Sequence, residues 1–221
     1  MLQETTVLTI WTYDWVPEGP RGYVRDLRLR WACEEAQLAY EVRSVSFDER
    51  EPEHFARQPF GQIPFLEDNG LTLFESGACL LHLGRKSDTL MPRDPAAEAE
   101  VLEWTIAALN SIEMVSVPLM VVGRSSEGGQ RLAGWLAMRL AQLETVIESR
   151  EWIAAERFTV ADILMADVLR QTKAMTGLPG DYPTLEAYIE RVCARPAFGK
   201  AHADQLAHFA AGDEARLRKR Q

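Results

Sequence analysis

The fold of this chain is constrained most by residues 62–66 (QIPFL), which are followed after a turn by residues 73–78 (LFESGA). Pro64 belongs at the head of an apolar strand, because proline has no N–H for the ladder and is confined to first residues and edges. We predict that the Ile63–Pro64 bond is cis, which turns the main chain of the preceding residue toward a ligand instead of a neighbouring strand. Residue 63 is therefore expected to offer its N–H and C=O to a bound molecule.

A carboxylate and a hydroxyl, Glu75 and Ser76, stand where a helix is expected to begin. The first N–H groups of a helix have no partner within it and form the positive end of its dipole, so they favour a bound carboxylate. Together with the proline step, this predicts a docking site for a small peptide that carries a free acid. The alternative is an ordinary hairpin with a proline at its entrance and a capped helix after it.

This order of residues resembles the glutathione-binding half-site of the cytosolic glutathione transferases, of bacterial type and uncertain class. In that family an Ile-Pro or Val-Pro pair binds the cysteinyl main chain of glutathione, and a Glu-Ser or Asp-Ser pair binds its γ-glutamyl end. The resemblance implies that Ile63 and Pro64 contact the cysteinyl group and that Gln62 adds a contact. It also implies that Glu75 and Ser76 hold the γ-glutamyl group.

The first third of the chain alternates expected strands and helices. One helix carries a single apolar stripe formed by Leu29, Ala32, Cys33 and Ala36. Strands are expected at 7–12, 41–45, from 64 and at 71–74, and further helices at 51–57 and 75–86. This order of βαβ, helix and ββα is that of the thioredoxin fold, a small sheet flanked by helices.

A linker with two prolines, residues 89–95, separates this part from a second part without strand signals. Helices are expected at 96–122 with a bend at Pro118, at 130–149, from 159, at 183–195 and from 197. We therefore predict an α/β thioredoxin-like domain at residues 1–88 and an all-α C-terminal domain at residues 96–221. This is the architecture of the glutathione transferases.

The start of the third of these helices carries a capping box. Thr159 can accept from the first turn while Asp162 reaches back to the N–H of Thr159, and Phe158 and Ile163 form a hydrophobic staple. The family carries such a box at this place, where its role is in folding. Asp167, on the same apolar helix, is interpreted as a hydrogen-bonded core carboxylate.

Composition and charge exclude several classes of function. With 24 basic and 33 acidic residues the net charge is −9, which argues against nucleic acid or an anionic membrane as partner. No apolar run approaches the ~18 residues of a membrane span, and no secretory signal is recognised. Three cysteines and four histidines are scattered, so neither a disulfide framework nor a metal site is indicated. We expect a cytoplasmic protein without a metal.

Glutathione chemistry needs an activated thiol, because the thiolate is the nucleophile and a free thiol has a pKa of about 8.5. In family members the group that activates this thiol is a tyrosine at the end of the first strand, or a serine or cysteine at the start of the first helix. Residues 1–32 contain neither serine nor cysteine. Two tyrosines remain: Tyr13 at the end of the first strand, and Tyr23, which falls where the serine types keep their serine. We favour Tyr13 as the catalytic donor and keep Tyr23 as the alternative.

The resemblance implies an enzyme with glutathione as co-substrate, which transfers the thiolate to a hydrophobic electrophilic small molecule and forms a homodimer. A non-catalytic ligand-binding or interaction protein on the same scaffold is the competing interpretation. Glutathione-dependent peroxide reduction, which uses the same thiolate, is a third. The thiol-activating donor separates the first interpretation from the second.

Overall fold

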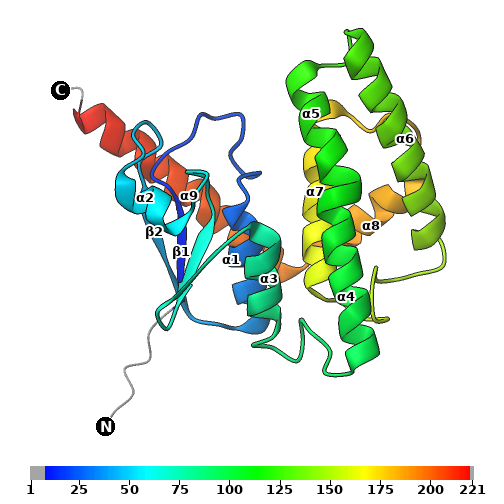
Figure 1. Cartoon of the computed structure of the whole chain (residues 1–221), viewed down its shortest axis with the longest axis horizontal. Coiled ribbons are helices and arrows are strands. Elements are labelled where there is room, and N and C mark those ends of the chain that lie inside the picture. The colour runs from blue at the N-terminus through cyan, green and yellow to red at the C-terminus, as the bar shows by residue number, and fades with distance from the viewer. Residues whose placement is uncertain (1–7, 220–221) are drawn as a thin grey trace. The chain divides into compact units, whose positions relative to one another are not determined.

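The computed structural model describes residues 8–219, and the chain divides into two compact units, most of whose elements are labelled in Figure 1. Unit 1 comprises Met1–Lys86 and Pro196–Gln221, and unit 2 comprises Ser87–Arg195. The C-terminal helix, which the sequence analysis placed in the all-α domain, thus belongs by its contacts to unit 1. The physical reason is that this helix packs along the first helix of the chain.

Unit 1 contains a four-stranded sheet with the strand order β2-β1-β3-β4. The strands are β1 Leu8–Tyr13, β2 Tyr40–Val45, β3 Phe65–Asp68 and β4 Leu71–Phe74. β2 pairs in parallel with β1, whereas β3 is antiparallel to both β1 and β4. The strand expected at 71–74 is found with these bounds, and the strand expected from Pro64 begins one residue later. Residue 7 of the first expected strand lies outside the described residues.

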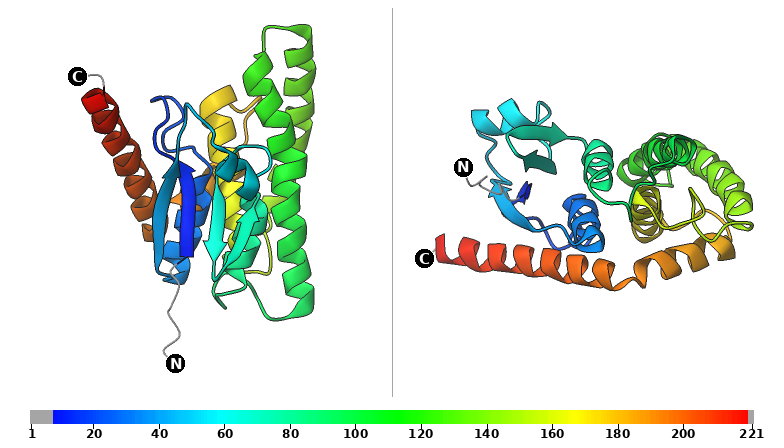
Figure 2. Two further views of the ribbon diagram at one scale, coloured as in Figure 1. Left: turned by 60° about the vertical axis from the view of Figure 1, so that its left-hand side comes forward. Right: turned by 90° about the horizontal axis from the view of Figure 1, so that it is seen from below.

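Four helices complete unit 1: α1 Asp26–Ala36, α2 Pro52–Arg57, α3 Ser76–Gly84 and α9 Pro196–Lys219. α1 and α3 pack against each other on one face of the sheet, and α9 runs beside α1 (Figure 2). The apolar stripe of α1 is buried as expected, with Leu29, Ala32 and Cys33 at 0% exposure. Trp31 of α1 packs edge-on against Phe198 of α9, with ring centroids 4.8 Å apart. This arrangement confirms the thioredoxin-like fold.

Every regular element within the described residues of unit 2 is a helix, which confirms the all-α part of the fold. The elements are α4 Pro95–Ala107, η1 Ala108–Glu113, α5 Met114–Val122, α6 Glu127–Ile147, α7 Val160–Thr176 and α8 Pro183–Cys193. α7 is the core helix and contacts α4, η1, α5 and α8. The glycine pair 128–129 lies in the first turn of α6. Ser126 caps this turn, because its Oγ accepts from Gly129 N–H (3.0 Å).

The long helix expected at 96–122 is a continuous helical run, Pro95–Val122, with the π-helical turn η1 in its middle. Pro118 lies inside α5 without ending it. By length and composition this run could cross a membrane, with a mean hydropathy of 1.7 and 39% of its most apolar window buried. Asn110, Ser111 and Glu113 interrupt its apolar residues, so the run contains no unbroken apolar stretch of ~18 residues. A helix in a protein core passes the same test, and this run packs along α7 within unit 2.

The capping box expected before α7 is confirmed. Thr159 Oγ1 accepts from Ala161 N–H (3.3 Å), and Asp162 Oδ2 accepts from Thr159 N–H (2.9 Å). The other oxygen of Asp162 accepts from Ile153 N–H (2.9 Å) and from the Tyr188 hydroxyl (2.9 Å). Asp162 is fully buried, and this burial raises the pKa of its carboxyl to about 6. The box therefore also ties the preceding loop and α8 to the start of α7.

Asp167 is the core carboxylate that the sequence analysis expected. Its side chain is 1% exposed, and its Oδ1 accepts from Arg170 Nη2 at 2.8 Å. A buried charge is tolerated where a partner of opposite charge and hydrogen bonds are supplied. Asp167 therefore belongs to the structure of α7.

Candidate functional site

The loop that leads into β3 is held by two buried side chains from the end of α2 and the residue after it. Gln58 Oε1 accepts from Phe60 N–H (2.7 Å) and from Gln62 N–H (3.1 Å). His54 Nε2 donates to the Gln62 C=O (2.8 Å), and both His54 and Gln58 are only 2% exposed. The main chain of Gln62 is thus used within the protein, whereas its side chain is exposed.

The next residue, Ile63, differs from Gln62 in having its main chain free. Strand pairing with β1 begins only at Phe65, and no residue of the described chain hydrogen-bonds to the Ile63 N–H or C=O. The Ile63–Pro64 peptide is cis, which confirms the prediction from sequence. Pro64 is buried and Ile63 is half-buried. Ile63 therefore has one donor and one acceptor available beside a fixed proline.

Glu75 joins β4 to α3 in an unusual backbone conformation, with φ 68° and ψ 117°. For a residue with a side chain such a conformation costs ~1–3 kcal/mol, and it persists where the surrounding structure enforces it, often at functional sites. The Glu75 side chain is exposed, and its carboxylate accepts no hydrogen bond from residues 8–219. A negatively charged group is thus free beside the start of α3.

Ser76, the first residue of α3, is buried against α1. Its Oγ accepts a hydrogen bond of 3.0 Å from Arg28 Nη1, and the Arg28 side chain is 0% exposed. The sequence analysis did not identify Arg28, although its spacing from Ala32 (i, i+4) places it on the buried side of α1. The start of α3 therefore combines free helix N–H groups with a buried guanidinium, which together favour an anion.

Tyr13 is the last residue of β1, and its side chain contacts the loop before Ile63. Its hydroxyl donates to the Gly61 C=O (3.2 Å) and accepts from Arg50 Nη2 (2.9 Å). Arg50 Nε also donates to the Gly61 C=O (3.0 Å). The Gly61 C=O therefore accepts from two donors, Tyr13 and Arg50. The Tyr13 hydroxyl has a single proton, which it donates to Gly61. Arg50 was not identified from sequence, because nothing in its local pattern indicates this contact.

Tyr23 lies in the turn that precedes α1. It is half-buried, and its N–H donates to the Pro20 C=O (2.9 Å). The adjacent Gly22 has φ 79°, and a Cβ at this position would lie 2.6 Å from His202 Nε2 of α9. Close packing by α9 thus excludes a side chain at position 22. Tyr23 belongs to the segment that leads into α1, whereas Tyr13 contacts the loop before Ile63.

Helix α9 holds the segment between the two tyrosines. Asp213 accepts from Trp15 Nε1 (2.7 Å) and from both terminal nitrogens of Arg21 (2.6 and 2.7 Å). These hydrogen bonds lower the pKa of the Asp213 carboxyl to about 2. Further along, His208 Nε2 donates to the Tyr13 C=O (2.9 Å). The sequence analysis missed this support because it assigned α9 to the other domain.

The cysteines are not suited to activate or exchange thiols. Burial raises the pKa of the Cys33 and Cys79 thiols to about 12 and that of Cys193 to about 11, so all three stay protonated near neutral pH. Within the part of the chain that the structure describes, no cluster of three or more His, Cys, Asp or Glu side chains could hold a metal ion. The candidate groups for chemistry at this site are main-chain groups, Glu75, Ser76 and the two phenols.

Two family models match this chain. The model of the glutathione S-transferase N-terminal domain matches residues 19–85, and that of the C-terminal domain matches residues 128–196. Glutathione S-transferase 4 of Zea mays is 30% identical, with 76% of this chain and 83% of the maize protein covered. Glutathione S-transferase 1 of Schizosaccharomyces pombe is 26% identical, with 86% of this chain and 92% of the yeast protein covered.

The fold is also found in solved structures. A glutathione transferase family member from Pseudomonas fluorescens, crystallised with two glutathione molecules bound, matches with a TM-score of 0.78 and 27% identity. The match covers 90% of this chain and 94% of that structure. Both units of the present chain thus have counterparts in a protein that binds glutathione.

Proposed function

Since this chain belongs to the glutathione S-transferase family, we propose that it binds glutathione beside Pro64 and transfers the glutathione thiolate to an electrophilic small molecule. The observation that carries this proposal is the free main chain of Ile63, which lies outside the strand pairing although β3 begins two residues later. An extended peptide satisfies such a donor and acceptor with its own main chain. The cysteinyl residue of glutathione supplies both partners.

The other end of the proposed site matches the charges of a γ-glutamyl group, which carries an ammonium and a carboxylate. The free carboxylate of Glu75 is the partner for the ammonium. Ser76, the N–H groups that open α3 and the nearby Arg28 form the partner for the carboxylate. Gln62, with its exposed amide, is proposed as an additional contact. The two ends thus select both the charge pattern and the direction of the peptide.

Thiol activation is assigned to Tyr13 in this proposal, with Tyr23 as the alternative. The Tyr13 hydroxyl lies within hydrogen-bond distance of Gly61, two residues before Ile63, and therefore near the proposed cysteinyl position. Ultraviolet absorbance of bound glutathione tests the proposal directly. A thiolate band that appears well below the free-thiol pKa of about 8.5 supports catalysis. If glutathione binds but shows no such band, the proposed activation is wrong.

A second candidate function is a non-catalytic protein that binds a ligand or partner on the same scaffold. The observation that favours it is that the Tyr13 hydroxyl already donates its hydrogen bond to the Gly61 C=O. On this alternative, glutathione binds with an unperturbed thiol, and no turnover is measured with electrophilic acceptors. Peroxidase or isomerase activity would use the same thiolate and is measured with hydroperoxide or isomerisable substrates. We further propose a cytoplasmic location, no metal, and neither nucleic acid nor membrane as partner.

Replacing Glu75 by Ala should weaken glutathione binding by ~1–3 kcal/mol, because the γ-glutamyl ammonium loses its charged partner. Glu75 is the better probe than Ser76, since Ser76→Ala would also leave the buried Arg28 without its hydroxyl acceptor. Calorimetric titration with glutathione measures the change. Glu53→Ala, at an exposed carboxylate on α2, is the matched control and should bind as the wild type does. Unchanged affinity in Glu75→Ala would contradict the proposed site.

We also propose that the protein is a homodimer. The helical run Pro95–Val122 exposes apolar side chains that packing within unit 2 does not cover, among them Ile106 (51% exposed), Met114 (50%) and Val121 (76%). Exposed apolar patches of this kind mark interaction surfaces. Light scattering at micromolar concentration should give twice the chain mass of 24.9 kDa. Val121→Asp should shift the mass toward the monomer, whereas Thr145→Asp, at an exposed position of α6, should not. A monomeric wild type would refute the proposal.

A further inference from the structure

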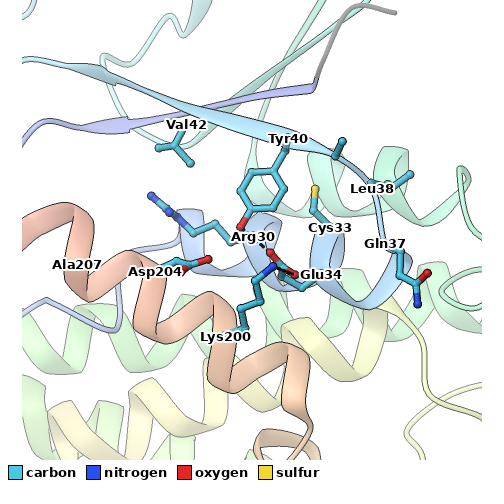
Figure 3. A pocket seen from close by; sticks show the side chains of 11 residues that line it. Arg30, Cys33, Glu34, Gln37, Leu38, Tyr40, Val42, Lys200, Asp204 and Ala207 are labelled. Carbon is cyan, nitrogen blue, oxygen red and sulfur yellow. Dashed lines mark hydrogen bonds and ion pairs between the residues drawn. The ribbon is translucent and has the colours of Figure 1, made fainter.

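Unit 1 contains a pocket, with a volume of about 760 Å³, between α1, β2 and α9 (Figure 3). Small-molecule sites have volumes of roughly 300–1,000 Å³, so this pocket is large enough for a ligand. β2 is the edge strand at one end of the sheet, whereas the residues proposed to bind glutathione lie next to β3, β4 and α3. The pocket is thus distinct from the proposed glutathione site.

One polar group in this pocket lacks a partner. The Arg30 side chain is 3% exposed, and its Nε donates to Asp26 Oδ2 (2.8 Å). Its Nη2 is buried, and no acceptor for it exists among the described residues. Figure 3 shows the guanidinium between β2 and α9, on the same side as Asp204. Since buried polar groups are almost always hydrogen-bonded, this nitrogen calls for an acceptor from outside the described residues, and a carboxylate is the strongest one.

A second group in the pocket carries the opposite charge. Asp204 of α9 is exposed and accepts no hydrogen bond from residues 8–219. Its negative charge contributes to raising the pKa of nearby Lys200. Lys200 Nζ is instead paired with Glu34 Oε2 (2.7 Å), while the Tyr40 hydroxyl donates to Glu34 Oε1 (3.1 Å). Lys200 and Glu34 are therefore paired with each other, and Glu34 also accepts the hydrogen bond from Tyr40. The groups left for a ligand are Nη2 of Arg30, whose Nε is held by Asp26, and the Asp204 carboxylate.

The rest of the lining is mixed. Its apolar part is formed by Cys33, Leu38, Val42, Ala207 and the ring of Tyr40, and Gln37 adds a polar side chain. Burial raises the pKa of the Cys33 thiol to about 12, so Cys33 remains protonated and packs as a small apolar side chain. The pocket thus combines apolar side chains with one guanidinium nitrogen, Arg30 Nη2, that has no acceptor among the described residues, and with the carboxylate of Asp204.

We propose that this pocket binds a small zwitterion with an apolar chain, its carboxylate on Arg30 and its ammonium on Asp204. A free apolar amino acid is the simplest molecule of this class. Arg30 lies on α1 and Asp204 on α9, so the ligand would also connect these two helices. This site goes beyond the proposed glutathione chemistry and does not depend on it.

Three probes with the same six-carbon chain test the charge pattern: L-norleucine, hexanoate and hexylamine. In a ligand-detected NMR titration of the full chain, L-norleucine should bind best, about tenfold tighter than hexylamine, since loss of a hydrogen bond to a charged group has roughly this effect. It should bind about threefold tighter than hexanoate, because Asp204 is exposed and its interaction is screened. Equal binding of all three probes would overturn the proposal, as would no binding of L-norleucine.

Variants place the binding in this pocket. Ala207→Phe fills the pocket and should weaken L-norleucine binding at least tenfold, whereas Ala210→Phe, at an exposed alanine of α9 outside the lining, should change it less than twofold. Asp204→Asn should lower L-norleucine affinity to that of hexanoate and leave hexanoate unchanged. Glu75→Ala, which should weaken glutathione binding, should leave L-norleucine binding unchanged. The two sites can therefore be tested separately. L-norleucine affinity that is insensitive to Ala207→Phe would overturn the assignment.

Discussion

Replacing Tyr13 by Phe should lower the turnover of an electrophilic acceptor by a factor of ~100 to 1,000, the usual effect of removing a donor to a developing anion. Glutathione affinity should change little, because the proposed peptide contacts are made by Ile63, Glu75 and Ser76. The pH at which bound thiolate appears should rise, since the phenol would stabilise the thiolate but not the thiol. Steady-state kinetics and ultraviolet titration of the same variant measure both effects.

The surroundings of Tyr13 explain how a phenol already in a hydrogen bond can serve a thiolate. When the Tyr13 hydroxyl redirects its hydrogen bond from Gly61 to the thiolate sulfur, the Gly61 C=O keeps its bond from Arg50 Nε (3.0 Å) and is not left unpaired. Arg50 Nη2 at the same time donates to the Tyr13 oxygen (2.9 Å), which polarises the O–H and strengthens it as a donor. The exchange therefore replaces one acceptor of the phenol by another without orphaning a buried group.

Tyr23→Phe is the matched control and should have a much smaller effect on turnover. The reverse ranking would transfer the role to Tyr23 at the start of α1, where the helix dipole also favours an anion. Wild-type turnover in both single variants and in the double variant would exclude both phenols. If bound glutathione then also shows no thiolate absorbance, the non-catalytic interpretation is favoured.

Replacing Asp162 by Ala should lower the free energy of unfolding by about 4 kcal/mol, because several buried donors lose their acceptor at once. These donors are the N–H groups of Ile153 and Thr159 and the hydroxyl of Tyr188. Denaturant unfolding monitored by circular dichroism measures the loss. Asp181→Ala, at an exposed carboxylate before α8, is the control and should stay within ~0.5 kcal/mol of the wild type. A loss as small as that of Asp181→Ala would contradict the structural role of the capping box.

The same carboxyl gives a pH dependence whose sign follows from its environment. Burial raises the pKa of Asp162 from 3.8 to about 6, so the folded state holds this proton more tightly than the unfolded chain does. Stability from this group is therefore fully present below pH 3.8 and is lost as the pH rises through about 6. In Asp162→Asn this component should vanish, and the difference between the two unfolding curves across this pH range isolates it. An unchanged pH profile in Asp162→Asn would assign the titration to another group.

Features with local causes were determined by the sequence alone. Proline lacks an N–H, so the position of Pro64 before β3 follows from its own chemistry. The capping box needs only Thr159 and the residue three positions later, and it was found where the pattern predicted it. The strand Leu71–Phe74 and the order of elements in unit 1 likewise follow from short patterns of polar and apolar residues. Each of these signals acts over a few residues, within which the chain has few conformations to choose from.

Contacts between distant segments were decided only by the tertiary structure. The bond from Arg28 to Ser76 joins residues 48 positions apart, and that from Trp15 to Asp213 joins residues 198 positions apart. No local pattern indicates such pairs, because they depend on which helix faces meet once the core is packed. The same holds for α9, whose composition suits either unit and whose packing on α1 assigns it to unit 1. Sequence thus favoured Tyr13 and kept Tyr23 as the alternative. Packing placed the hydroxyl of Tyr13 on the loop before Ile63, because β1 and that loop meet at the end of the sheet.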